Sequence, residues 1–107
     1  MTKEKLLPPE ILSSLPALGV TGEEHDPVVQ VKFFYPDFSW TWYAIEFDGI
    51  DTFFGYVDGD FPELGYFSLR ELRETRGAFG CAVERDLHFQ DTPLQVIQQK
   101  AEARIFG

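Results

Sequence analysis

The segment FSWTWYAIEFDG, residues 38–49, constrains the fold more than any other part of the chain. It holds five aromatic residues and an isoleucine, and it ends in Asp48-Gly49. Aromatic and β-branched residues favour strands, and an Asp-Gly pair favours a tight hairpin turn. A second strand-like run, IDTFFGYV, follows directly. We therefore predict a central antiparallel hairpin in which residues 39–47 pair with residues 50–57 through a two-residue turn.

Both faces of this hairpin are apolar in the sequence. Alternation places side chains on two opposite faces: Trp40, Trp42 and Ala44 on one, and Thr41, Tyr43, Ile45 and Phe47 on the other. A strand that is buried on one side only would alternate with polar residues. Either helices cover both sides of the sheet or one aromatic face meets a partner. With three short helices available, we favour partial covering by the helices.

Helical and strand periodicities predict the elements on either side of the hairpin. A short helix over residues 6–18 begins near Pro8-Pro9 and carries an apolar stripe of Ile11, Leu12 and Leu15. Further strands are expected at 28–35, with Val29, Val31, Phe33 and Tyr35 on one face, at 63–67 and at 81–89.

Two capping patterns predict the other helices. Ser68 and Glu71 form a capping box at the start of a helix over 68–75. Thr92 as N-cap, followed by Pro93 and Gln95, begins a C-terminal helix that turns Leu94, Ile97 and Ala101 inward. The predicted fold class is α+β, an antiparallel β-meander sheet with short flanking helices, in a single domain over residues 1–107.

Composition narrows the possible partners and compartment. The net charge of −9 opposes direct binding to DNA, RNA or anionic lipid. One cysteine allows no disulfide within the chain, which favours a reducing cytoplasm. Residues 1–9 have lysines without a long apolar run, so we expect no secretory signal. No segment approaches the roughly 20 apolar residues of a membrane span. We expect a cytoplasmic protein that does not enter a membrane.

No pattern in the sequence indicates catalysis, and we expect no catalytic residue, metal or cofactor. Cys81 and His88 fall on opposite faces of the predicted strand, too far apart for a nucleophile and its base. Asp58, Asp60 and Glu63 do not match a calcium loop, and turn chemistry accounts for the aspartates. With one Cys and two distant His, the chain has no zinc ligand set, and its glycines do not form a phosphate loop.

Negative charge is concentrated in the aromatic half of the chain. Residues 33–69 contain seven acidic residues and no Lys or Arg. Meander topology predicts two groups: Glu46, Asp48 and Asp51 at one end of the sheet, and Asp37, Asp58, Asp60 and Glu63 at the other. The candidate partner-binding residues are Glu46, Asp48, Asp51, Asp58, Asp60, Glu63 and Trp40. The alternative is that Asp suits turns and that negative charge keeps an aromatic-rich domain soluble.

Several motifs together resemble one protein family. They are WTWYA with EFDG, DTFFG, ELGYFSL and ERDL, within a match that extends from about Leu6 to Leu94. The chain is similar to an uncharacterised bacterial family, a domain of unknown function encoded on plasmids and integrated mobile elements. The resemblance implies a small domain in a mobile-element setting and assigns no catalytic residue. Cys81 and His88 stand where apolar or aromatic residues are common in that family, which argues against a reactive role for either.

Two functional hypotheses follow. The first is a non-enzymatic acidic protein-binding module of a mobile element, whose partner is a basic protein such as a nucleic-acid-binding one. Its sharpest forms are a DNA-mimicking inhibitor and an accessory factor that acts on a host or element protein. The second is a small enzyme or ligand-binding domain with a carboxylate-lined pocket beside the hairpin, with Glu46 and Glu84 as candidates. Clustered acids without a converging His, Lys or Cys favour the first.

Overall fold

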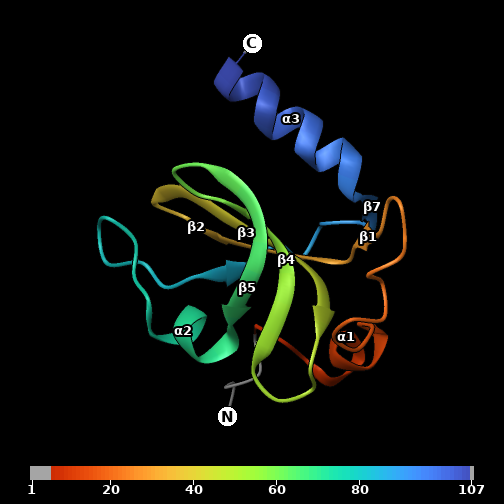
Figure 1. Cartoon of the computed structure of the whole chain (residues 1–107). Helices are drawn as coiled ribbons and strands as arrows, with labels where there is room; N and C mark the ends of the chain where they lie inside the picture. The colour runs from red at the N-terminus through yellow and green to blue at the C-terminus, as the bar shows by residue number, and fades with distance from the viewer. Residues whose placement is uncertain (1–5, 107) are drawn as a thin grey trace.

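The computed structural model describes residues 6–106, with side chains up to residue 104, and has the expected α+β fold (Figure 1). Five strands form one antiparallel sheet in the order β5-β4-β3-β2-β6, and β1 and β7 form a separate two-stranded pair. The elements are α1 (Pro9–Ser14), β1 (Val28–Val29), β2 (Val31–Tyr35), β3 (Phe38–Phe47), β4 (Thr52–Asp58), β5 (Pro62–Ser68), α2 (Leu69–Glu74), β6 (Glu84–Arg85), β7 (Thr92–Pro93) and α3 (Leu94–Phe106).

The central hairpin is confirmed, but its turn is longer than predicted. β3 and β4 pair antiparallel up to Phe47 and Phe53, so four residues, 48–51, connect the strands. Oδ1 of Asp48 accepts hydrogen bonds from the amides of Ile50, Asp51 and Thr52 at 2.8, 2.8 and 3.0 Å. Gly49 has a φ of +87°, a conformation that favours glycine. The prediction of a two-residue turn was wrong because one carboxylate organises three amides into a wider loop.

A β-bulge at Ile45 changes which side chains share a face. The register shifts between Ala44 and Glu46, so one residue of β3 has no partner on β4. Ile45 keeps the side of the sheet expected for it, but Phe47 moves to the side of Trp42 and Ala44. Its predicted grouping with Ile45 was wrong because the extra residue reverses the alternation.

The strand predicted over residues 28–35 divides at Gln30. The first part, β1, pairs with β7, and the second part, β2, pairs with β3. The amide of Gln30 donates to the carbonyl oxygen of Ala44 at 3.1 Å. Val29 and Val31 consequently belong to different cores, although strict alternation placed them together.

Helices pack on both faces of the sheet and cover them in part, as favoured from the sequence. One core contains Phe33, Trp42, Phe47 and Phe53 under Leu69 and Leu72 of α2, and Leu7 and Leu15 on either side of α1 also reach it. The other core packs Leu94, Ile97 and Ala101 of α3 against Val29, Ile45 and Tyr56. This inward stripe of the C-terminal helix is confirmed. Helix α1 is shorter than predicted, and Leu12 of its expected stripe is exposed.

Two further local predictions need correction. Of the strand expected over residues 81–89, only β6 and an isolated bridge between Arg76 and Ala82 form. Thr92 pairs within β7 instead of capping a helix, and Asp26 from a distant loop accepts from the amide of Gln95 at 2.9 Å. The Ser68 cap is confirmed, because its Oγ accepts from the amide of Glu71 at 3.2 Å. Within residues 6–106, no helix is both long and apolar enough to cross a membrane.

Candidate binding groove

Glu46, a candidate binding residue, lies inside the protein. Its side chain is buried and accepts hydrogen bonds from the amides of Gly19 and Thr21, both at 2.8 Å, and from the hydroxyl of Thr21. Burial raises the pKa of this carboxyl, but the hydrogen bonds from Thr21 and Gly19 outweigh it and hold the pKa below its ordinary value. Glu46 therefore fixes the 19–21 loop to β3.

Asp48 and Asp51 satisfy backbone amides at the β3–β4 end of the sheet. Hydrogen bonds from the amides of Ile50 and Asp51 lower the pKa of Asp48. Asp51 accepts from the hydroxyl of Ser68 at 2.6 Å and from the amide of Arg70 at 2.8 Å, and these bonds lower its pKa. The first turn of α2 thus receives an acceptor from the preceding hairpin as well as from its own N-cap.

At the opposite end of the sheet, two more acids, Asp37 and Asp58, bind other parts of the chain. Asp58 is buried, and Nη2 of Arg104 lies 2.6 Å from each of its carboxylate oxygens, which ties α3 to β4. Asp37 accepts from the amides of Phe79 and Cys81 at 2.7 and 3.2 Å. Burial raises the pKa of Asp37, but these hydrogen bonds outweigh burial and hold the pKa below its ordinary value.

Only two of the seven acids in residues 33–69 lack a hydrogen-bond or ion-pair partner in the part of the chain that the structure describes. They are Asp60 and Glu63, and both are exposed. The structure therefore separates the predicted acidic binding residues into those with a hydrogen-bond or ion-pair partner within the chain (Glu46, Asp48, Asp51, Asp58) and those without one among the described residues (Asp60, Glu63). Trp40 is half-buried, beside the buried Trp42.

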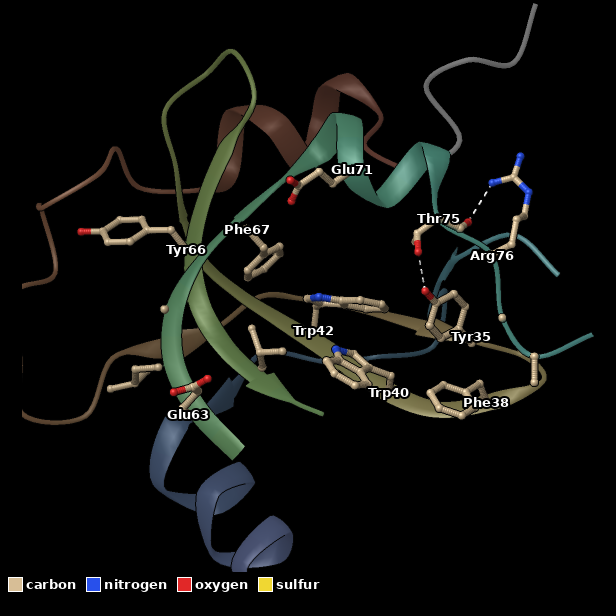
Figure 2. Close-up of a pocket in the computed structure, with 15 residues that line it drawn as sticks. Tyr35, Phe38, Trp40, Trp42, Glu63, Tyr66, Phe67, Glu71, Thr75 and Arg76 are labelled. Atoms are coloured by element: carbon tan, nitrogen blue, oxygen red, sulfur yellow. Dashed lines mark hydrogen bonds between the residues drawn. The ribbon is translucent and has the colours of Figure 1, made fainter. Parts of the chain in front are cut away.

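A groove of about 840 Å³ opens beside Trp40 and Trp42 (Figure 2). Its floor is a line of aromatic side chains at alternate positions of β3. The ring centroids of Phe38 and Trp40 are 6.4 Å apart, as are those of Trp40 and Trp42. Tyr35 closes the line, 5.3 Å from Trp42 and 5.9 Å from Phe38. Strand β5 forms one wall, and α2 with the segment 75–78 forms the other.

Short contacts hold these walls in place. The hydroxyl groups of Tyr35 and Thr75 are 2.6 Å apart and hydrogen-bonded (Figure 2). A Cβ at position 59 would collide with the indole of Trp40, so the ring lies directly on the Gly59 backbone. The carboxylate of Asp37, described above, anchors the chain just beyond residue 78. The groove is thus formed in advance, which lowers the entropy cost of binding.

The groove carries negative charge. Glu63 of β5 and Glu71 of α2 line it, and neither carboxylate has a hydrogen-bond or ion-pair partner within residues 6–106. The one guanidinium in its lining, that of Arg76, donates to the carbonyl oxygens of Arg73 and Thr75 at 2.9 and 2.8 Å. The groove thus combines aromatic surface with two unpaired carboxylates, a chemistry that suits cationic ligands.

Sequence reasoning identified Trp40 and Glu63 of this groove and missed Tyr35, Tyr66 and Glu71. Two aromatic residues of the floor, Trp40 and Trp42, were placed on one face of a strand by their alternation in the sequence. Glu71 comes from α2, and Tyr66 borders the groove from β5 although its side chain points to the other side of that strand.

The carboxylate pocket of the second hypothesis does not form from Glu46 and Glu84. Glu46 is buried on β3, whereas Glu84 is exposed on β6, and β2 lies between these strands. Within residues 6–106, no three His, Cys, Asp or Glu side chains gather in a way that could hold a metal ion. The neighbouring Asp37 carboxylate raises the pKa of the exposed Cys81 thiol, which opposes thiolate formation.

Comparison with known proteins identifies the family. The profile described as "Protein of unknown function (DUF2958)" matches residues 6–105. The chain belongs to this family. No curated protein matches the chain, and no solved structure does. The family assignment agrees with the resemblance in that the chain is a domain of unknown function, and it brings no activity or site residues with it.

Proposed function

We propose that this member of the family is a non-enzymatic binding module that takes a basic peptide segment of a partner protein into the aromatic groove. The observation that carries the proposal is the groove itself. A line of aromatic rings lies along the groove between two glutamates, neither of which has a hydrogen-bond or ion-pair partner within residues 6–106.

Aromatic faces and carboxylates together favour Lys and Arg side chains. The ring of an aromatic residue attracts a cation through its quadrupole, and a carboxylate adds a charge-assisted hydrogen bond. The methylene stem of Lys or Arg packs on the same apolar surface. The volume of about 840 Å³ accommodates a few side chains of an extended segment rather than a folded domain.

Fewer acidic residues are available to a partner than the sequence suggested. Asp60 and Glu63 at the β4–β5 turn, together with Glu71, are available to a partner. Glu46, Asp48, Asp51 and Asp58 contribute to the overall negative field, which accelerates association with a basic partner. Direct contact of the buried Glu46 and Asp58 with a partner would require their internal contacts to break, whereas Asp48 is exposed and engages only Oδ1.

In the mobile-element setting that the resemblance implies, the partner would be a host or element protein with a basic segment. Such segments are common in proteins that bind nucleic acid. If the module acts as a DNA mimic, duplex DNA competes with it for the partner. If it acts as an accessory factor, the partner binds the module and DNA together.

The test is a selection from a library of eight-residue peptides with Lys or Arg at every second position, followed by affinity measurement by fluorescence anisotropy. We expect binders whose affinity falls at least about tenfold in Trp40→Ala. Affinity should also fall in the double variant Glu63→Gln, Glu71→Gln, and the loss should shrink as salt rises, because the Debye length shortens from about 10 Å at 0.1 M to 3 Å at 1 M.

Matched controls separate the groove from the rest of the surface. Phe61→Ala removes an exposed aromatic side chain that does not line the groove, and Glu23→Gln removes an exposed carboxylate of the 19–25 loop. Both should bind like the wild type. No selected binder, or binders that lose equal affinity in Phe61→Ala and Trp40→Ala, would contradict the proposed function.

A further inference from the structure

Strand β5 is an open edge of the five-stranded sheet. It pairs with β4 over seven residues, from Pro62 opposite Asp58 to Ser68 opposite Thr52. Its other side has no strand partner in the described part of the chain, because β5 ends the strand order. An edge strand presents backbone N–H and C=O groups that another extended chain can pair with.

The groove includes this edge. Five consecutive residues of β5, from Glu63 to Phe67, line it. Successive side chains of a strand point to opposite faces, so a wall made of five consecutive residues includes main-chain atoms as well as the side chains of one face. Figure 2 shows the alternation: Phe67 points toward the tryptophans, whereas Tyr66 points away on the other side of β5.

The β5 edge has little of the usual protection against pairing, because Glu63 is the one charged residue in the strand. It contains no Lys or Arg, its proline stands at the first position, and Leu64 and Tyr66 are 46% and 70% exposed. A Cβ at Gly65 would have no neighbour within 4 Å, so the face of the sheet to which this position points is open in the middle of the strand. The opposite edge, β6, has only two residues. Proteins normally keep such an edge short, charged or covered unless it binds something.

We propose that the partner's segment binds as an added strand along β5, with alternate side chains entering the groove. This inference rests on the proposed function and specifies its geometry. Main-chain hydrogen bonds to β5 supply sequence-independent affinity, and the side chains that face Trp40 supply selectivity. Lys or Arg at these positions lies between Glu63 and Glu71, while the intervening side chains lie on the Leu64 and Tyr66 side.

Charge selects this occupant over a second copy of the chain. Two copies that pair through β5 would each bring a net charge of −9 and their own Glu63 to the same edge. Like charges at close range oppose such a dimer, whereas a basic segment is attracted by the same field.

N-methylation of the peptide backbone tests the added strand. In a strand, backbone N–H groups point alternately to the two sides, so only one alternate set of a bound peptide can donate to β5. The best binder from the alternating library is synthesised in two forms, with N-methyl groups either at the odd or at the even positions. One form should lose at least about tenfold in affinity, and the other should stay within about threefold of the parent.

Amide hydrogen exchange of the protein supplies a second readout. Binding of the parent peptide should slow the exchange of the outward-facing amides within residues 63–67 and leave those of the β1–β7 pair unchanged. Sedimentation of the free protein should show a monomer; a stable dimer that protects the same β5 amides would instead assign the edge to a second copy.

The outcomes distinguish the two proposals. Some peptides could bind through Trp40 and yet keep their affinity with both methylation patterns, or lose the same affinity with each. That result would overturn the proposal of an added strand and leave the groove as the binding site. Unchanged exchange in β5 on peptide binding would do the same. Failure of every library peptide to bind would overturn the proposed function, and the added strand with it.

Discussion

Replacing Glu46 by Gln tests the finding that this buried acid is a hydrogen-bond acceptor that stabilises the fold. The carboxylate accepts three hydrogen bonds, from the amides of Gly19 and Thr21 and from the Thr21 hydroxyl. Gln keeps one carbonyl oxygen but turns an NH₂ group toward at least one of these donors. A buried donor without an acceptor costs about 1–3 kcal/mol, and bonds to a charged acceptor contribute about 1.5–3 kcal/mol each.

We therefore expect Glu46→Gln to lower the free energy of unfolding by about 2–4 kcal/mol. That is a large part of the roughly 5–15 kcal/mol of a small domain. The assay is urea unfolding at pH 7, followed by tryptophan fluorescence and far-ultraviolet circular dichroism. Glu63→Gln is the matched control. Because its exposed carboxylate has no partner, it should change stability by less than about 0.5 kcal/mol.

The pH dependence gives this prediction a second signature. The pKa of Glu46 is lower in the folded state than in the unfolded chain, where it is about 4.3. Its contribution to stability is therefore complete above the unfolded pKa and is lost as pH falls through the folded pKa. The difference in stability between wild type and Glu46→Gln should narrow below about pH 4. A variant as stable as the wild type, or a gap that does not change with pH, would refute the reasoning.

Three further substitutions test the fold. Trp42→Ala should cost about 3–5 kcal/mol, since Trp42 is only 9% exposed in the core, and an unchanged melting temperature would contradict this. Gly49→Val should cost about 1–2 kcal/mol in urea unfolding because φ is +87°, whereas Gly49→Asn should cost less; equal losses would argue against backbone strain. Ser68→Ala should cost about 0.5–2 kcal/mol by removing the α2 cap and the bond to Asp51, and no loss of stability would show that neither contact stabilises α2.

Much of the fold was predictable because its signals are local. Aromatic and β-branched runs predicted β3 and β4, apolar residues on both faces predicted helices on both sides, and Ser68 predicted the start of α2. The bulge at Ile45 was not predictable in this way. Where both faces of a strand are apolar, the sequence does not show where an extra residue reverses the alternation.

The roles of the acids depend on residues distant in the sequence. Glu46 accepts a hydrogen bond from Thr21, which lies 25 positions away in the sequence, and Asp37 accepts one from Phe79, 42 positions away. Asp26 accepts from the amide of Gln95 in the first turn of α3, 69 positions away. Charge counting found the acidic segment but could not show which carboxylates turn inward. The groove is similar: its floor follows from alternation along β3, whereas its β5 and α2 walls depend on how the sheet curves.

The most direct test of the binding groove is a two-dimensional NMR titration of ¹⁵N-labelled protein with the selected basic peptide. The chain has two tryptophans, so two indole N–H signals report on Trp40 and Trp42 separately from the backbone. We expect the Trp40 indole and the amides of residues 63–67 to shift most, with smaller shifts at higher salt. Shifts confined to the 48–51 loop or to α3, with the Trp40 indole unchanged, would contradict the account.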